Sequence, residues 1–393
     1  MHNPISRRSL MLRLSSLCGL ATNTFNGDAS AQTNEAYSPV VPLNAESKLR
    51  FPSDHGAHEK FRIEWWYVTG WLNNSMGFQV TFFRSKTSYK DSLSADKNNS
   101  RFAPNQLLLA DAALSITEHQ SLLHDGMAAR TFPALASYSS NDCDLHINQG
   151  ARRWSMQRLD NSPTTMGSQY EIKVQSTDFA LELNLLSPHE PWLQGNEGYS
   201  RKGPEPLQAS YYYSRPQLIT QGKVRYKNKW IPASGTSWLD HEWSSELLDP
   251  TAVGWDWLGL NLNDGSALTL FRVRDKTGSP IHSYAAQRFQ NGNILFYKPK
   301  FEAKGQPWKS PRTGAQYPIW WTIQLAPNQA SAAQAMTLEI EPHMPDQELD
   351  GRRSTGTVYW EGAVRVMQII GAGKEQIGKG YLELTGYYAP VRL

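Results

Sequence analysis

The sequence is poor in cysteine, with two in 393 residues, Cys18 and Cys143. Cys18 lies in an N-terminal segment that we expect to be removed, so the mature chain keeps one cysteine. A single cysteine cannot form an internal disulfide, and the same count excludes metal sites built from cysteines. The length allows two or three domains with sizeable cores.

Motifs of common catalytic chemistry are also missing. His241 and Glu242 are followed by Trp-Ser-Ser, so there is no H-E-x-x-H zinc pair, and no G-x-S-x-G nucleophile elbow occurs. Residues 373–380 nearly match a Walker A loop, but Gly380 stands where Ser or Thr should ligate magnesium. The residues that follow alternate as a strand, whereas a P-loop must lead into a helix. We interpret this segment as a hairpin turn, and we expect no cofactor and no metal.

An excess of charge of one sign is missing too. The chain has 39 basic and 36 acidic residues, and three of the basic residues stand among the first 31. Nucleic-acid binding needs a concentrated basic surface, so we expect no nucleic-acid partner. No hydrophobic run reaches the roughly 20 residues of a membrane helix, so we expect no membrane span in the mature chain.

The N-terminus has the features of an export signal. Residues 6–10 read Ser-Arg-Arg-Ser-Leu, which is a twin-arginine pattern, and a short apolar run follows to residue 21. Residues 29–31, Ala-Ser-Ala, form an A-x-A cleavage site. We therefore predict a signal peptide over residues 1–31, by the twin-arginine route or the Sec route, and a periplasmic or secreted protein. Residues 32–54 are polar and are predicted to form a linker or arm.

Aromatic and turn residues are abundant, with 14 Trp, 17 Tyr, 13 Phe, 28 Gly and 23 Pro. From residue 61 onward one strand-like segment follows another, such as 65–72 and 78–84 on either side of the turn cluster 73–77. No long stretch shows a helical period. This pattern predicts an all-β protein made of sandwiches or barrels.

An internal repeat indicates two domains. Residues 67–72, Tyr-Val-Thr-Gly-Trp-Leu, are similar to residues 255–260, Trp-Asp-Trp-Leu-Gly-Leu, and both return strands end in Phe-Arg, at Arg84 and Arg272. The alternative is a chance similarity of two amphipathic hairpins. The repeat predicts two related β domains, residues 55–220 and 221–393.

Three clusters mix ionisable groups with large aromatic side chains: His55 and His58 with residues 64–67, residues 237–243, and residues 254–257. Alternate residues of a strand share a face, so Asp240 and Glu242 should point one way and His241 and Trp243 the other. An acid held against indole rings is partly desolvated, which moves its pKa toward the range useful for proton transfer. Indole faces also stabilise a developing cation. The combination fits the protonation of an alkene.

A structural interpretation of these clusters stands beside the catalytic one. Tryptophans near the first strand of a barrel often close its end, with a charged residue stacked on the ring. His55 and His58 are interpreted as part of a solvated loop. Residues 211–214, Tyr-Tyr-Tyr-Ser, are interpreted as a core strand that enters the second domain.

The clusters also carry a resemblance to a family. Residues 64–67 (Glu-Trp-Trp-Tyr), 212–214 (Tyr-Tyr-Ser), 235–243 (Gly-Thr-Ser-Trp-Leu-Asp-His-Glu-Trp) and 380–387 (Gly-Tyr-Leu-Glu-Leu-Thr-Gly-Tyr) resemble the AttH/CrtC family of secreted AttH-like proteins and carotenoid 1,2-hydratases. The resemblance covers essentially the whole mature chain. It implies two tandem lipocalin-like, calycin-type antiparallel β-barrels. The hydratase branch implies acid-catalysed addition of water to an isoprenoid double bond, and the secreted branch implies an ABC-transporter permease as partner.

Two hypotheses of function follow. In the first, an exported protein binds an apolar molecule, such as a lipid or an isoprenoid. In the second, the protein is a hydratase, isomerase or hydrolase that acts on such a molecule by acid catalysis without a cofactor. The candidate catalytic residues are Asp240, His241, Glu242 and Asp256. The candidate ligand-binding residues are Glu64, Trp65, Trp66, Tyr212, Trp243, Trp255 and Trp257.

Overall fold

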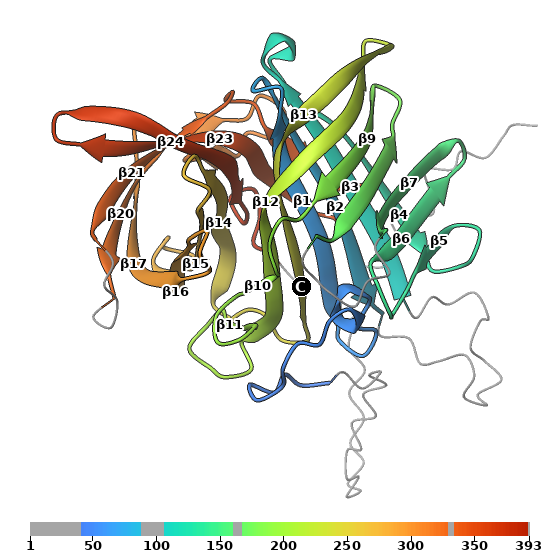
Figure 1. Cartoon of the computed structure of the whole chain (residues 1–393), viewed down its shortest axis with the longest axis horizontal. Helices are drawn as coiled ribbons and strands as arrows, with labels where there is room; N and C mark the ends of the chain where they lie inside the picture. Colours follow the sequence, from blue (N-terminus) through green and yellow to red (C-terminus); the bar gives the residue numbers. More distant parts are fainter. Residues whose placement is uncertain (1–40, 88–105, 160–166, 329–333, 392–393) are drawn as a thin grey trace, which may run out of the picture. The chain divides into compact units, whose positions relative to one another are not determined.

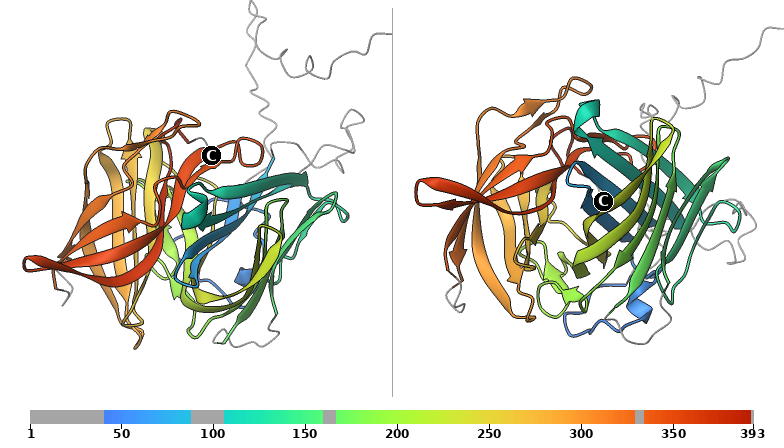
Figure 2. Two further views of the ribbon diagram at one scale, coloured as in Figure 1. Left: turned by 90° about the horizontal axis from the view of Figure 1, so that it is seen from above. Right: turned by 45° about the horizontal axis from the view of Figure 1, so that its top comes forward.

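The computed structural model describes residues 41–87, 106–159, 167–328 and 334–391. The predicted signal peptide, residues 1–31, and the first part of the predicted arm lie outside these residues. The described chain belongs to one compact unit, Tyr37–Leu393, which is dominated by two large antiparallel sheets (Figure 1 and Figure 2). In the part of the chain that the structure describes, no helix is long and apolar enough to cross a membrane.

Sheet 1 is built from the N-terminal strands, in the spatial order β4-β3-β2-β1-β13-β12-β9-β8-β7-β6-β5. Strand β6 also contacts β3 and β4, so the sheet curls back toward its own beginning. Its strands are β1 (Ile63–Leu72), β2 (Met76–Lys86), β3 (Gln106–Ile116), β4 (Leu123–Arg130), β5 (Ala136–Tyr138), β6 (Asp144–Gln149), β7 (Arg152–Arg158), β8 (Gln169–Gln175), β9 (Phe179–Leu186), β12 (Ala209–Tyr226) and β13 (Lys229–Ser244). The short strands β10 (Trp192–Leu193) and β11 (Tyr199–Arg201) pair with β12, and two 3-10 turns are η2 (Ser53–His55) and η3 (Thr117–His119).

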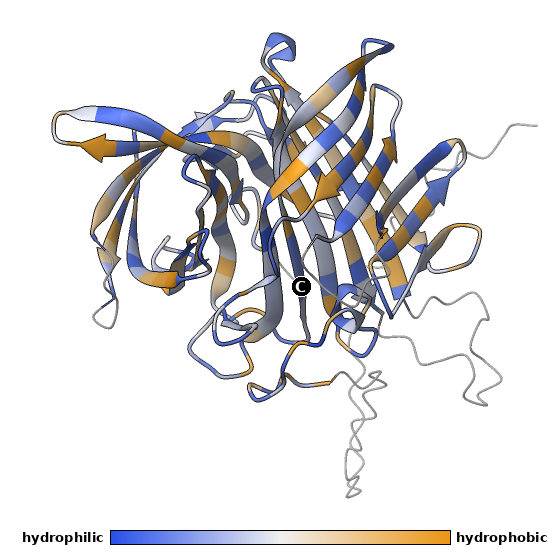
Figure 3. Ribbon diagram, in the orientation of Figure 1, coloured by the Kyte–Doolittle hydropathy of each residue, from blue (hydrophilic) through white to orange (hydrophobic). Residues whose placement is uncertain are grey.

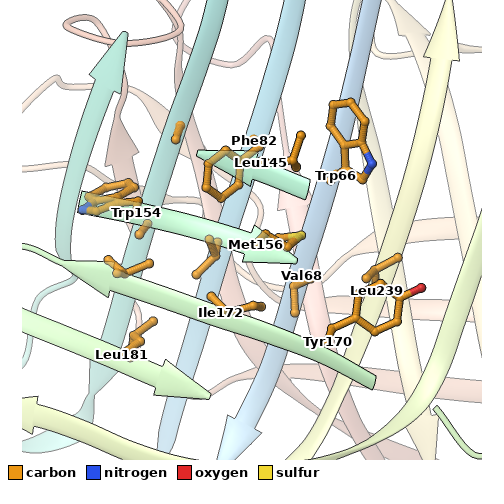
Figure 4. Packing of buried hydrophobic residues seen from close by; sticks show 14 of the residues in the cluster. Trp66, Val68, Phe82, Leu145, Trp154, Met156, Tyr170, Ile172, Leu181 and Leu239 are labelled. Carbon is orange, nitrogen blue, oxygen red and sulfur yellow. The ribbon is translucent and has the colours of Figure 1, made fainter. Parts of the chain in front are cut away.

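The hairpin β1–β2 shows why the sequence forms this sheet. Asn73 and Asn74 adopt φ values of 50° and 57°, a left-handed conformation that asparagine tolerates, and they turn the chain between the strands. Polar and apolar residues alternate along the strands, as Figure 3 shows by colour. Every second side chain, such as Trp66 and Val68, therefore points into the interior of sheet 1, where it packs on residues of the facing strands (Figure 4).

Sheet 2 is a closed barrel. Its spatial order is β21-β20-β17-β16-β15-β14-β24-β23-β22, and the additional pairing of β21 with β23 closes the ring. Its strands are β14 (Ala252–Leu262), β15 (Ala267–Asp275), β16 (Pro280–Arg288), β17 (Ile294–Ala303), β20 (Trp321–Pro327), β21 (Met336–Pro342), β22 (Glu348–Asp350), β23 (Val358–Ile370) and β24 (Gly373–Leu384), with the small hairpin β18 (Trp308–Lys309) and β19 (Gln316–Tyr317) beside them. The interpretation of residues 373–380 as a hairpin turn is wrong: these residues form the first part of strand β24, and the turn of the hairpin lies just before them, at Gly371 with φ 59°. The two barrel-like sheets confirm the expected pair of tandem lipocalin-like barrels.

The change from one sheet to the other comes later than predicted. The predicted boundary at 220/221 falls inside β12, which pairs with β13 from Tyr211 to Tyr226 in one long hairpin. The chain leaves sheet 1 only after Ser244 and enters sheet 2 at Ala252. Accordingly, Tyr212 stays in sheet 1. The sequence does not reveal that one strand continues through residue 220, because polar and apolar residues alternate in the same way in one long strand as in two shorter strands.

The two sheets pack directly on one another. The indole Nε1 of Trp71 donates to the Gly380 carbonyl at 3.0 Å, and the backbone N–H of Gln217 donates to Asn261 Oδ1 at 2.8 Å. Aromatic residues from both sheets form one buried cluster there, which includes Tyr67, Trp71, Trp238, Trp257, Phe271 and Tyr381. Strand β1 and the second half of β13, residues 237–244, are consequently buried on both faces, one toward the interior of sheet 1 and one toward sheet 2.

Candidate functional site

At the end of strand β13, successive side chains point to opposite faces of the sheet, as the sequence predicts. Asp240 and Glu242 face a cavity between the two sheets. His241 is fully buried on the other face, and Trp243 belongs to the core of sheet 1. Two neighbouring residues, Asp240 and His241, therefore belong to different environments.

The cavity between the sheets has a volume of about 410 Å³. Sheet 1 contributes Trp65 and Tyr67 from β1 to its wall, and sheet 2 contributes Trp255 and Trp257 from β14. The C-terminal residues 388–391 and the loop before β23 complete it. A second cavity, of about 480 Å³, lies on sheet 1, but its lining is mainly polar and includes none of the predicted site residues. Ligand pockets are typically apolar with a few convergent polar groups, so the cavity between the sheets is the better candidate.

Asp240 is the polar centre of this cavity. Its Oδ1 accepts hydrogen bonds from Ser214 Oγ at 2.6 Å and Trp238 Nε1 at 2.7 Å, and its Oδ2 accepts one from Tyr212 at 2.9 Å. The Tyr212 hydroxyl in turn accepts from Trp257 Nε1 at 3.2 Å, which directs its own proton at Asp240. Burial raises the pKa of Asp240 to about 7, although the three donors act in the opposite direction. Such a carboxyl group can both accept and release a proton near neutral pH.

Two further carboxyl groups reach the cavity from sheet 2. Glu383 on β24 and Glu361 on β23 both line it, and both are buried. Burial raises the pKa of Glu383 above its usual range, and burial together with repulsion from Glu383 raises that of Glu361. Neither residue was among the predicted candidates. Glu383 could have been found, because it alternates with Leu382 and Leu384 within residues 380–387 and pairs across the sheet with Trp257.

One amine of the cavity pairs with Glu242. Lys202 Nζ lies 3.1 Å from Glu242 Oε1, and it sits 4.6 Å from the Tyr212 ring centroid and 4.2 Å from that of Phe271. Burial lowers the pKa of Lys202. Lys202 lines the same cavity and was also missed by the sequence analysis, since nothing near residue 202 marks it.

Asp256 lies apart from the cavity acids. It alternates with Trp255 and Trp257 and therefore points into sheet 2, where it pairs with Arg272 at 2.6 Å and Arg274 at 3.1 Å. The two arginines balance the charge of its carboxylate, so Asp256 takes part in a structural ion pair and does not act as a proton donor for the cavity.

His241, Trp66 and Trp243 face the interior of sheet 1, around the side chain of Glu64. Glu64 is fully buried and pairs with Arg84 at 2.7 Å. His241 Nε2 and His58 Nδ1 lie 2.9 Å and 2.7 Å from its Oε1. The cluster lies on the face of β13 opposite to Asp240 and Glu242, but Glu64 and Arg84 also line the cavity between the sheets.

The interpretation of His55 and His58 as solvated is wrong. His55 is fully buried, its Nδ1 lies 2.8 Å from the Tyr213 hydroxyl, and its carbonyl accepts from Trp66 Nε1 at 3.1 Å. Burial alone would lower the pKa of His58, but the neighbouring carboxylates of Glu64 and Asp54 raise it to about 8. The segment before β1 packs on sheet 1, which local sequence does not reveal.

Comparison with known proteins places this geometry in context. The family of AttH-like proteins matches residues 42–387. The crystal structure of a protein assigned as AttH from Nitrosomonas europaea is 40% identical in sequence and has a TM-score of 0.74, with 89% of this chain and 99% of that chain covered. None of the curated proteins compared with the sequence matches it.

More distant structures share the fold alone. Kievitone hydratase from Nectria haematococca is 12% identical with a TM-score of 0.62, and the match covers 89% of this chain and 98% of that one. CghA, in its structure with Sch210972, is 10% identical with a TM-score of 0.59, and the match covers 90% of this chain and 97% of that one.

Proposed function

The chain belongs to the AttH-like family, and from this premise we propose that it binds an apolar small molecule between its two sheets and transfers protons to and from it. The observation that carries the proposal is Asp240, a carboxyl group in an aromatic cavity with a pKa of about 7. Such perturbed groups are concentrated at functional sites.

The substrate class follows from the wall of the cavity. Indole and phenol rings from both sheets line it together with aliphatic side chains, and about 410 Å³ is within the usual range for a pocket that holds a small organic molecule. A ligand with a flat, unsaturated hydrocarbon part would bury apolar surface against Trp65, Trp255 and Trp257.

The chemistry follows from the acids. Burial raises the pKa of Glu383 to about 8, so at pH 7 this acid is mostly protonated and can give a proton to one carbon of a double bond. The cation formed on the other carbon is stabilised by the indole faces. Water then adds to that carbon, and the proton it loses passes to the carboxylate of Asp240. The sum is the addition of one water molecule, and loss of a proton from the cation instead gives an isomer.

Kievitone hydratase has the same fold and is named for such an addition, which supports hydration as the form this proton transfer takes. Export of the chain and an ABC-transporter partner stay predictions from the sequence.

A second candidate function is binding without turnover. It is favoured by the hydrogen bonds of Asp240, because three donors already occupy its oxygens and hold it in place. In that case the cavity would carry an apolar molecule and the acids would only orient it.

One experiment separates the two functions. The mature chain is purified, its bound apolar ligand is identified by native mass spectrometry, and the ligand is incubated with the protein in isotopically labelled water. We expect labelled product with the wild type, and unchanged binding without product with Asp240→Asn. Glu182→Gln, on the exposed face of sheet 1, is the matched control and should behave as wild type. Stoichiometric binding with no label in any variant would leave the binding function alone.

A further inference from the structure

Three donor atoms converge in the interior of sheet 1, on the face of β13 opposite to Asp240 and Glu242. His58 Nδ1, Glu64 Oε1 and His241 Nε2 each offer one ligand atom, and all lie within 4.8 Å of one another. They come from three separate segments: the loop after η2, strand β1 and strand β13. We propose that they bind one divalent transition-metal ion, with Zn²⁺ as the best fit to two imidazoles and one carboxylate.

The atoms around the donors support this inference. Metal-binding histidines almost always hold a partner with the second ring nitrogen, and metal-binding carboxylates are hydrogen-bonded as well. His58 Nε2 lies 3.4 Å from Asp54 Oδ1, and His241 Nδ1 lies 3.3 Å from the Tyr213 hydroxyl. Glu64 Oε2 accepts from Arg84 Nε at 2.7 Å and from the backbone N–H of His58 at 2.8 Å. Each ligand side chain is thus held by a partner of its second polar atom, while its donor atom lies close to the other two donor atoms.

The rings are also held in position by stacking. The His58 ring stacks on Trp243 with centroids 3.7 Å apart and planes within 6°, and His241 stacks on Trp66 at 4.5 Å and 20°. Tryptophan is bulky and buried here, so neither imidazole can rotate freely. The site is therefore organised before an ion arrives.

Access and coordination are consistent with an ion. The side chains of Glu64 and His241 are fully buried, but that of His58 is 17% exposed, so an ion can enter beside it. Three protein ligands leave one position of a tetrahedral zinc site for water or another ligand. Binding would displace the hydrogen-bonding protons between the imidazoles and Glu64, so protons are released.

Sheet 2 provides an internal comparison. Glu64 pairs across the β1–β2 hairpin with Arg84, and Asp256 pairs across the β14–β15 hairpin with Arg272 in the same way. The buried acid and arginine are therefore a shared feature of both sheets. Asp256 has Arg274 as its second partner, whereas Glu64 has two imidazoles. Among the residues that the structure describes, sheet 1 thus has the one group of three such donors, whereas the sequence analysis expected no metal.

The proposed ion would clamp the segment before β1 onto β1 and β13. It lies on the face of β13 opposite to Asp240 and Glu242, and it adjoins the cavity through Glu64 and Arg84, which also line the cavity. The test of the inference does not use activity, so its failure is distinguishable from a failure of the proposed function.

The test uses Co²⁺ as a spectroscopic probe for the full mature chain, purified without a histidine tag and stripped with a chelator. We expect one equivalent of Co²⁺ to give a visible absorption band of low-symmetry coordination, Zn²⁺ to displace it, and thermal unfolding to move to higher temperature in the presence of either ion. His58→Ala should lose the band. His146→Ala is the matched control, since that imidazole is half-buried beside Asp144 on β6, and it should keep the band.

A second variant guards against misfolding of His58→Ala. Asp54→Asn leaves all three donors and removes an outer partner, so Co²⁺ affinity, measured by competition with a chelator, should fall by about 10-fold to 100-fold. The inference is overturned if the wild type gives no band, or if His58→Ala and Asp54→Asn both bind Co²⁺ as tightly as the wild type.

Discussion

Replacement of Asp240 by asparagine should stabilise the protein above neutral pH and destroy its proton transfer. The pKa of Asp240 rises from 3.8 to about 7 on folding because the group is buried. At about 1.4 kcal/mol per pH unit, the charged form therefore costs the folded state about 4 kcal/mol. Asparagine has no such charge, but its amide hydrogens would face donors such as Ser214 and Tyr212, at a cost of about 1–3 kcal/mol. The net gain at pH 8 is then about 1–3 kcal/mol.

The sign of the pH dependence is fixed by the raised pKa. The folded state binds more protons than the unfolded state between pH 3.8 and about pH 7, so the contribution of Asp240 to stability is full below pH 3.8 and falls as pH rises through 7. The free energy of unfolding of wild type and of Asp240→Asn is measured by urea titration at about pH 5, 6, 7 and 8. In the difference between the two proteins, the contributions of the other titrating groups cancel. We expect this difference to shift in favour of the variant as pH rises. A difference that stays constant with pH would refute the perturbed carboxyl group and the chemistry built on it.

Three more predictions concern separate parts of the molecule. Asp256→Asn should lower the free energy of unfolding by about 3–5 kcal/mol, because it leaves the buried Arg274 and the half-buried Arg272 without their shared carboxylate, yet ligand affinity measured by fluorescence should not change. Trp257→Phe removes the hydrogen bond to Tyr212 and should weaken ligand binding in the same assay while the fold, followed by circular dichroism, is retained; equal affinity would place the ligand elsewhere. Gly77→Ala should destabilise the contact between the sheets, since its Cβ would meet side-chain atoms of both within 2.5–2.7 Å, and an unchanged melting temperature would contradict this packing.

Local sequence predicts the hairpins and the faces of their strands, because both depend on neighbouring residues. Alternation in residues 238–243 correctly separates Asp240 and Glu242 from His241 and Trp243. The turn between β1 and β2 follows from its asparagines.

Long-range geometry is beyond the same reasoning. Glu383 and Asp240 meet only because the sheets pack face to face, and no local pattern encodes which faces meet. The burial of His55 depends in the same way on the contact of its segment with Tyr213 in β12. Asp256 was predicted as an acid because it lies next to tryptophans, but its arginine partners lie on the following strand.

The burial of both faces of β13 over residues 237–244 has a consequence for insertions and deletions. A shift of one residue in a strand transfers every side chain to the opposite face, and β13 is held in register by β1 on one side and β12 on the other. Deleting one residue within 238–243 would therefore move the imidazole of His241 toward the cavity and the carboxyl groups into the interior of sheet 1. A residue added at the exposed turn of Lys227 and Asn228, at the far end of the same hairpin, leaves the register intact. In a library of single-residue insertions and deletions, the same hairpin should thus be intolerant at one end and permissive at the other.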